Sequence, residues 1–120
     1  KNYNEDRLKK VISICSLDYL LKEREKGLYA EVGEFGKEFS GGQAQRILLA
    51  RTIYKKSKIV ILDEFTSALD SKNTNKIIKN LTKFIKDEDR VMIVASHNQD
   101  IINYFDENWI ISKGKLIISN

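Results

Sequence analysis

Two short aliphatic runs constrain the fold of this chain more than any other feature. Residues 59–62 read IVIL and residues 91–95 read VMIVA. The first run is too short for a helix and too uniformly apolar for a half-exposed strand. Both runs are therefore interpreted as strands buried on both faces of a parallel sheet. Between them, apolar residues recur at the spacing of an amphipathic helix, which Ser71 can cap. Strand, helix and strand form a βαβ unit of the α/β class.

Two further helices are expected before the first strand. Asn4 begins the first, because a capping amide is followed by acids in the first turn. A break is expected near Ser16. The apolar stripe of this first segment, interpreted as core packing rather than a ligand site, consists of Leu8, Val11, Ile12, Cys15 and Tyr19. The second helix covers residues 42–55, a largely apolar run interrupted by Gln45, Arg46 and Arg51, and a glycine-punctuated loop precedes it.

The C-terminal part predicts a hairpin. Residues 86–90 are interpreted as an exposed turn before the second strand, and residues 101–104 as a short helical turn after it. Residues 108–112 and 115–119 alternate enough to form two strands that turn at Lys113-Gly114. We expect this hairpin to close the edge of the sheet.

Composition excludes several classes of protein. The 120 residues, 42% hydrophobic and 32% charged, suffice for one folded core. A single cysteine excludes an internal disulfide, and no apolar run approaches the ~18 residues of a membrane span. The net charge of +4 comes from basic residues spread through the chain, which favours a solvated surface over nucleic-acid binding. Because residue 1 is Lys and the sole methionine is Met92, we expect that an upstream segment has been removed.

Polar residues follow both predicted strands. Asp63 and Glu64 come directly after the first strand, and His97 follows the second. All three are expected at one edge of the sheet, where α/β proteins bind ligands. Paired carboxylates there suit a divalent metal and an activated water. The alternative is a solvated strand end for the acids and an ordinary structural or exposed histidine.

A glycine-bearing turn opens the second predicted helix. Residues 40–43 read SGGQ. Such a helix start suits an anion, because free backbone N–H groups and the positive end of the helix dipole meet there. An ordinary structural helix can begin in the same way. The glycine turn and the acid pair Asp63-Glu64 together suggest phosphate chemistry.

The combination of these segments resembles the ATP-binding cassette (ABC) ATPases over nearly the whole chain. Residues 39–43 are similar to the family signature LSGGQ, with Phe39 in place of the leucine. Residues 59–63 resemble the Walker B strand, and Glu64 stands at the position of the catalytic glutamate. Phe65 replaces the usual alanine of the family's DEATSALD sequence.

Three further segments extend the resemblance in the family's order. Residues 67–70, SALD, are similar to the D-loop, and His97 to the switch histidine. Residues 31–36, EVGEFG, resemble the loop that precedes the signature in exporter-type members. The family's P-loop is missing: Gly36-Lys37 lacks both the glycine five positions earlier and the following Ser or Thr that the P-loop requires.

The resemblance implies the second half of a P-loop NTPase (RecA-like) nucleotide-binding domain, with parallel strands, a C-terminal β-hairpin and part of the ABC helical subdomain. Residues 1–57 would belong to the helical subdomain and residues 58–120 to the ATPase core, together a single incomplete domain. Because no P-loop is present, we expect the chain alone to lack ATPase activity. Its Walker B-like strand would present an unpaired apolar edge, so we expect a marginal or self-associated fragment.

The resemblance also implies roles for individual residues. Asp63 would hold Mg²⁺, Glu64 would polarise the attacking water as general base, and His97 would contact the γ-phosphate of ATP. In a head-to-tail dimer, the phosphate bound by a second nucleotide-binding domain would be contacted by Ser40, Gly41, Gly42 and Gln43. Communication across that dimer would involve Ser67 and Asp70. Coupling to the transmembrane domain would involve Glu31, Gly33 and Glu34.

The implied function is ATP hydrolysis that powers export, at the cytoplasmic face of the cell membrane. Its partners would be the second nucleotide-binding domain and a transmembrane domain, with no nucleic acid. Two alternatives stay open. One is the head-domain lobe of a DNA-repair or chromosome-organising ABC ATPase, and the other is a non-catalytic regulatory fragment.

Overall fold

The computed structural model describes residues 3–22 and 39–119 of the chain. In chain order, the elements are α1 (Glu5–Ile14), α2 (Asp18–Lys22), α3 (Gly41–Tyr54), β1 (Ile59–Asp63), α4 (Ser71–Asp87), β2 (Val91–Ala95), the 3-10 helix η3 (Gln99–Tyr104), β3 (Asn108–Ser112) and β4 (Lys115–Ser119). The predicted glycine-punctuated loop lies outside the described residues. Within them, every helix is too short or too polar to cross a membrane.

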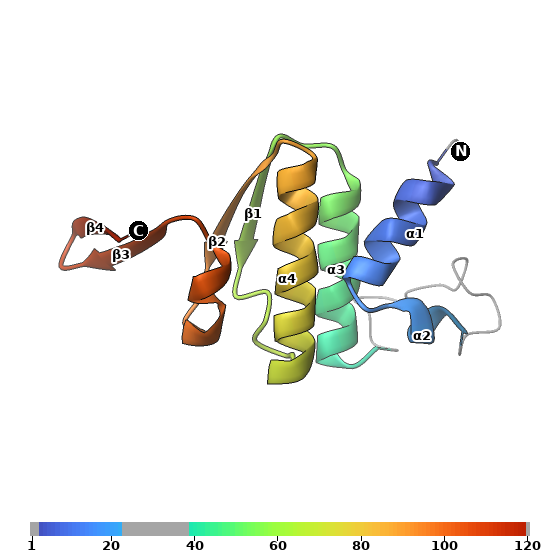
Figure 1. Cartoon of the computed structure of the whole chain (residues 1–120). Helices are drawn as coiled ribbons and strands as arrows, with labels where there is room; N and C mark the ends of the chain where they lie inside the picture. The colour runs from blue at the N-terminus through green and yellow to red at the C-terminus, as the bar shows by residue number, and fades with distance from the viewer. Residues whose placement is uncertain (1–2, 23–38, 120) are drawn as a thin grey trace.

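The predicted βαβ unit is confirmed by β1, α4 and β2. The two strands are parallel, with Ile59 opposite Val91 and Asp63 opposite Ala95. Figure 1 shows α1, α3 and α4 on the same side of this two-stranded sheet. The parallel pairing brings the carboxyl ends of both strands to one edge, which is where the candidate site residues follow.

Only one face of the sheet is buried by the described residues. Val60 and Leu62 point into the core, whereas Ile61 is 70% exposed. The exposed face carries Ile59, Ile61, Val91 and Ile93. The prediction of strands buried on both faces is therefore wrong for this structure, because helices cover the sheet from one side only. Aliphatic composition indicates that both faces suit burial, but it does not supply the second covering layer.

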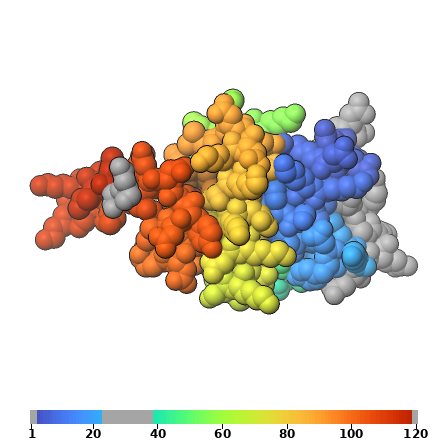
Figure 2. Space-filling model, in the orientation of Figure 1, coloured from blue at the N-terminus to red at the C-terminus, as the bar shows by residue number. Residues whose placement is uncertain are grey.

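The C-terminal hairpin has the predicted strands and turn. β3 and β4 are antiparallel, and the turn residues Lys113 and Gly114 have positive φ angles of 48° and 72°, which suit a tight hairpin turn. The hairpin forms a separate two-stranded sheet, so the prediction that it closes the edge of the first sheet is wrong. Figure 2 shows it as a narrow extension from the body of the molecule. Its apolar side chains are exposed because no described element packs on them; they are Trp109, Ile110, Ile111, Leu116, Ile117 and Ile118.

The core lies between α1, α3, α4 and the covered face of the sheet. The predicted apolar face of α4 is confirmed, and its buried members are Ile77, Ile78, Leu81, Phe84 and Ile85. Asn4 caps α1 as predicted, accepting a hydrogen bond from the backbone N–H of Arg7 at 2.8 Å. The predicted break is confirmed at Ser16, which has a φ angle of 52°.

The predicted apolar stripe of the first segment is confirmed except at its end. Val11, Ile12 and Cys15 are buried, but Tyr19 is exposed. Burial raises the pKa of the Cys15 thiol to about 12, so this thiol stays protonated at neutral pH and serves as a core residue. Tyr19 is held at the surface by a buried arginine of α3, which belongs to the candidate site.

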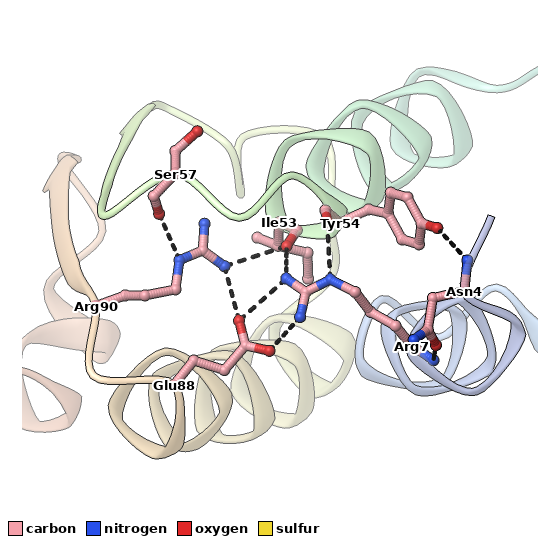
Figure 3. Close-up of polar contacts among 7 residues, drawn as sticks. All are labelled: Asn4, Arg7, Ile53, Tyr54, Ser57, Glu88 and Arg90. Atoms are coloured by element: carbon pink, nitrogen blue, oxygen red, sulfur yellow. Dashed lines mark hydrogen bonds and ion pairs between the residues drawn. The ribbon is translucent and has the colours of Figure 1, made fainter. Parts of the chain in front are cut away.

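Two arginines close the C-terminal end of α3 (Figure 3). Arg7 of α1 donates from Nη2 to the carbonyl oxygen of Ile53 at 2.9 Å and from Nε to that of Tyr54 at 2.7 Å. Arg90, just before β2, donates from Nη1 to the Ile53 carbonyl at 3.1 Å and from Nε to the Ser57 carbonyl at 2.6 Å. The last carbonyls of a helix have no intrahelical donor, so the two guanidinium groups satisfy them and oppose the negative end of the helix dipole.

Glu88 balances the charge of both arginines. Its carboxylate accepts hydrogen bonds from Nη1 and Nη2 of Arg7, the second at 3.0 Å, and from Nη1 of Arg90 at 3.2 Å. The side chains of Arg7 and Arg90 are only 10% and 3% exposed, so each needs a partner inside the protein. The prediction of an exposed turn over residues 86–90 is wrong at Glu88 and Arg90, because a run of charges does not reveal which side chains reach buried carbonyls.

We predict that Glu88→Gln lowers the free energy of unfolding by about 2–4 kcal/mol, because two nearly buried arginines lose their counter-charge. Hydrogen bonds from Arg7 hold the pKa of Glu88 below its ordinary value of about 4.5. The contribution of Glu88 is therefore present above that value and is lost as the pH falls through the lower folded-state pKa. Urea unfolding of wild type and variant at pH 7 and pH 3.5 measures both effects.

The matched control is Asp89→Asn, the same change of acid to amide one residue later. The side chain of Asp89 is fully exposed and its ion pair with Lys58 lies at the surface, so its replacement should change the free energy of unfolding by less than about 0.5 kcal/mol. Equal losses of stability in the two variants would contradict the importance of Glu88.

The exposed sheet face predicts self-association of the 120-residue chain. Ile61 and Ile93 stand opposite each other in the register of β1 and β2, and both are exposed. Apolar faces and unpaired strand edges of this kind favour association with other chains. We expect light scattering to show a molar mass that rises with concentration, and less so in the double variant Ile61→Lys/Ile93→Glu. A monomer with concentration-independent unfolding would contradict this prediction.

Candidate functional site

The glycine turn singled out in the sequence is the start of α3. Ser40 is the N-cap: its Oγ accepts from the backbone N–H of Gln43 at 3.3 Å, and Gln43 Oε1 accepts from the backbone N–H of Ser40 at 3.0 Å. This reciprocal capping box fixes the turn. The N–H groups of Gly41 and Gly42 belong to the first turn, where no helix carbonyl can accept them. The turn therefore directs backbone donors outward, as an anion site requires.

Glu64 and His97 meet at the carboxyl edge of the sheet. The backbone N–H of Glu64 donates to the carbonyl oxygen of Ala95 at 2.9 Å, which extends the pairing of β1 and β2 by one residue. Glu64 Oε1 accepts from the backbone N–H of His97 at 3.1 Å and lies 3.7 Å from Nε2 of the same residue. The imidazole is otherwise exposed to solvent. A carboxylate and an imidazole in reach of one small ligand are suited to proton transfer and charge stabilisation.

The backbone of Glu64 has an unusual conformation. Its φ angle is 46°, in the left-handed region that a non-glycine residue adopts at a cost of about 1 kcal/mol. The turn directs the chain away from β1 immediately after the strand ends. Such a conformation persists only where its surroundings hold it, and it is common at functional sites.

Asp63 is the last residue of β1 and is exposed beside Glu64. In the described ranges, 3–22 and 39–119, no group of three or more His, Cys, Asp or Glu side chains is arranged to hold a metal ion. The acid pair fits a hard cation such as Mg²⁺ as one or two oxygen ligands, with phosphate oxygens and water supplying the others. The donor set therefore suits a metal that arrives with a nucleotide.

Residues 64–70 connect β1 to α4 through two consecutive turns. The backbone N–H of Ser67 donates to the carbonyl oxygen of Glu64 at 3.1 Å, and that of Leu69 to the carbonyl oxygen of Thr66 at 3.0 Å. The side chains of Phe65 and Thr66 are buried, whereas Ser67 is exposed. The connection is anchored in the core at its beginning and presents its middle to solvent.

Asp70 ends this connection as the N-cap of α4. Its Oδ1 accepts from the backbone N–H of Asn73 at 3.0 Å. Hydrogen bonds from the backbone and side chain of Asn73 lower the pKa of Asp70, so the carboxylate remains charged. The prediction that Ser71 caps this helix is wrong by one residue, because two residues that both can cap a helix stand next to each other.

The glycine turn and the 64–70 connection lie against each other. A Cβ atom at Gly42 would meet the carbonyl oxygen of Ala68 at 2.6 Å, whereas one at Gly41 would lie 3.7 Å from the Ala68 Cβ. Gly42 is therefore required by the close approach of another backbone segment. Gln45 donates from Nε2 to Ser67 Oγ at 2.7 Å and accepts at Oε1 from the backbone N–H of Ala68 at 3.1 Å. Sequence reasoning treated Gln45 only as an interruption of an apolar run.

Arg46 is a second residue whose role the sequence did not reveal. It is buried and donates from Nε to the carbonyl oxygen of Gly42 at 3.2 Å and from Nη1 to that of Ser16 at 2.9 Å. Its Nη2 donates to the hydroxyl of Tyr19 at 2.5 Å, and the guanidinium lies over the Tyr19 ring. These contacts tie the start of α3 to the junction of α1 and α2. An arginine within a largely apolar helical run was the only signal of this role.

Three predicted residues cannot be placed with the others. Glu31, Gly33 and Glu34, expected to couple the chain to a membrane domain, lie outside the described residues. The structure brings the remaining predicted site residues to two neighbouring positions. Asp63, Glu64 and His97 share the sheet edge. The glycine turn, Ser67 and Asp70 lie on or beside the connection that follows.

Three comparisons relate this chain to known proteins. A family model described as "ABC transporter" matches residues 4–67. The chain is 40% identical over 96 residues to the ATP-dependent lipid A-core flippase 2 of Colwellia psychrerythraea, covering 80% of this chain and 16% of that protein. It is 34% identical over 117 residues to the ATP-dependent lipid A-core flippase of Pectobacterium atrosepticum, covering 98% of this chain and 20% of that protein. A putative export ATP-binding/permease protein of Rickettsia felis is 31% identical over 97% of this chain and 20% of its own length.

A solved structure matches the fold closely. The structure of a bacterial Atm1-family ABC exporter with ATP bound superposes with a TM-score of 0.81 at 26% identity, covering 94% of this chain and 19% of that one. The chain therefore spans at most about a fifth of the length of these relatives. The structural match covers 94% of this chain and the sequence match to the Pectobacterium flippase covers 98% of it.

The close contact at Ala68 leads to a matched pair of variants. Gly42→Ala places a methyl group against the Ala68 carbonyl, a backbone atom that cannot move without the connection, and we expect a loss of about 1–3 kcal/mol in the free energy of unfolding. Gly41→Ala adds the same atom in ordinary contact distance and should be neutral or slightly stabilising, because alanine favours a helix over glycine. Urea unfolding measures both. Similar losses for the two variants would show that the close approach is not what selects glycine at position 42.

Proposed function

The chain belongs to the ABC transporter family, and on this basis we propose that it is the C-terminal part of a nucleotide-binding domain whose ATP hydrolysis powers export across a membrane. The observation that carries the proposal is the contact between Glu64 and His97 at the end of a parallel strand pair, with Asp63 beside it. The names of the relatives favour export over the alternative of a DNA-repair or chromosome-organising ATPase, since they are flippases and export permeases.

At the domain's own nucleotide, Glu64 acts as general base and orients the attacking water. The backbone N–H of His97 donates to one carboxylate oxygen of Glu64, which leaves the second oxygen for water. The imidazole of His97 is exposed to solvent and would contact the γ-phosphate. Asp63 would hold a Mg²⁺ ion that arrives with ATP, directly or through water, and the ion would supply neutralisation of phosphate charge.

At the partner's nucleotide, the start of α3 contacts the γ-phosphate. Ser40 and Gln43 close the turn, so that the backbone N–H groups of Gly41 and Gly42 face the anion at the positive end of the helix dipole. This arrangement requires a second nucleotide-binding domain in head-to-tail orientation. Ser67 and Asp70 lie on the connection between the two half-sites and communicate across that dimer.

The remaining parts of the proposal follow from the family. Residues 1–57 belong to the helical subdomain and residues 58–120 to the ATPase core. Glu31, Gly33 and Glu34 serve in coupling to the transmembrane domain, and the complete protein acts at the cytoplasmic face of the membrane. The relatives that combine an ATP-binding part with a permease support this partner. Because this sequence contains no P-loop, the nucleotide is held by residues outside it.

A chimera tests the proposed reaction. In the flippase of Pectobacterium atrosepticum, the segment that aligns with this chain is replaced by this chain, and ATP hydrolysis is measured in the purified protein. We expect hydrolysis in the chimera, and a kcat at least about 100-fold lower in its Glu64→Gln variant, because the general base is lost while ATP binding remains. An exposed glutamate provides the matched control, Glu107→Gln, which should leave kcat unchanged.

The chain alone provides a further control. It should show no ATP turnover at any concentration, because it contains no P-loop to bind the nucleotide's phosphates. A chimera that binds ATP without hydrolysing it, or turnover by the chain alone that Glu64→Gln abolishes, would contradict the proposal.

A further inference from the structure

The 64–70 connection begins at the general base and passes against the start of α3. We infer that Gln45 is a positioning residue that fixes this connection to α3, so that the two half-sites carried by one chain keep a constant relative position. The inference rests on the proposed function for its catalytic consequence, whereas the contact itself is independent of it. Gln45 belongs to neither half-site and touches no reacting atom in the proposed mechanism.

The side-chain amide of Gln45 contacts three places along the connection. Its Nε2 donates to Ser67 Oγ at 2.7 Å and, at 3.5 Å, to the carbonyl oxygen of Glu64. Its Oε1 accepts from the backbone N–H of Ala68 at 3.1 Å. A side-chain amide donates and accepts at the same time, which no carboxylate or apolar side chain of similar length can do. The chemistry of glutamine is therefore matched to this position.

Gly42 supports the same contact from the same face of the helix. Residues 42 and 45 are three apart and so lie on one face of α3. The missing side chain of Gly42 permits the Ala68 carbonyl to approach, and Gln45 then binds the N–H of the same residue. The backbone of Ala68 is thus held by two residues of α3 through steric fit and hydrogen bonding.

The connection needs this support because of its first residue. Glu64 adopts a left-handed backbone conformation that relaxes unless it is held. Its N–H is fixed by the Ala95 carbonyl, and its carbonyl accepts from Ser67, the residue whose hydroxyl Gln45 binds. Gln45 therefore stabilises the turn at Glu64 directly, through the long hydrogen bond to the Glu64 carbonyl, and also through Ser67 and Ala68. A movement of the start of α3 toward a partner's phosphate would be transmitted to Glu64 through these contacts.

The test compares Gln45→Met with Arg51→Met in the chimera described above. Arg51 is exposed on the same helix, so it controls for the new side chain and for helix propensity. Hydrogen exchange followed by mass spectrometry reports on residues 64–70 without any nucleotide. We expect exchange in this segment to be about fivefold faster in Gln45→Met than in the unmodified chimera, and unchanged in Arg51→Met.

Kinetics provide the second readout. We expect kcat for ATP hydrolysis to fall about tenfold in Gln45→Met while KM changes less than about twofold, because the general base is displaced but nucleotide binding is not. Gln45→Glu keeps the acceptor for the backbone N–H of Ala68 and loses the donor to Ser67. Its kcat should therefore lie between that of the unmodified chimera and that of Gln45→Met. If Gln45→Met does not fold, Gln45→Glu carries the comparison.

Each outcome decides one part of the inference. Unchanged exchange at residues 64–70 in Gln45→Met would overturn the contact. Faster exchange with an unchanged kcat would overturn the positioning role. An unmodified chimera that does not hydrolyse ATP would count against the proposed function, and the exchange comparison would still decide whether Gln45 holds the connection.

Discussion

The structure depends on how the C-terminal end of α3 is closed. A helix that ends inside a protein leaves carbonyl groups without donors, and here the carbonyls of Ile53 and Tyr54 are met by Arg7 and Arg90. Glu88 makes the burial of two positive charges tolerable. The three charged residues come from α1, from the end of α4 and from the residue before β2, so one electrostatic cluster holds the helices and the sheet together (Figure 3). Removing any one of them would leave buried charge or unsatisfied carbonyls.

Fixing one end of α3 orients the other. The helix runs from Gly41 to Tyr54, about 20 Å at the rise of an α-helix, with the arginine cluster at its end and the glycine turn at its start. Two neighbouring residues fix the start of α3 to different parts of the structure. Arg46 binds the junction of α1 and α2, and Gln45 binds the 64–70 connection after β1. The helix therefore relates a sheet-edge site to a helix-start site that would serve different nucleotides. It positions both through the hydrogen bonds that hold its two ends.

Local signals made most of the secondary structure predictable. The capping residue Asn4, the hairpin turn at Lys113-Gly114 and the periodicity of α4 each act within a few residues, and all three were confirmed. Burial of both sheet faces was not, because Ile61 and Val60 look alike in sequence although only Val60 is covered. At the site, Glu64 and His97 could be placed from their positions after strands. Gln45 and Arg46 could not, because a polar residue within a helix gives no indication of which loop it will contact.

Asp70 has two roles, and a single substitution would affect both of them at once. It caps α4 through Asn73, and in the proposed dimer it also faces the neighbouring domain. Replacing Asp70 with alanine would remove the N-cap of α4 and would also remove the group proposed to act across the dimer, so the resulting defect could not be assigned to either role. Asparagine keeps a capping oxygen and removes the charge, so it separates the two effects. The effect of any substitution at Asp70 should therefore be interpreted first as an effect on the N-cap of α4.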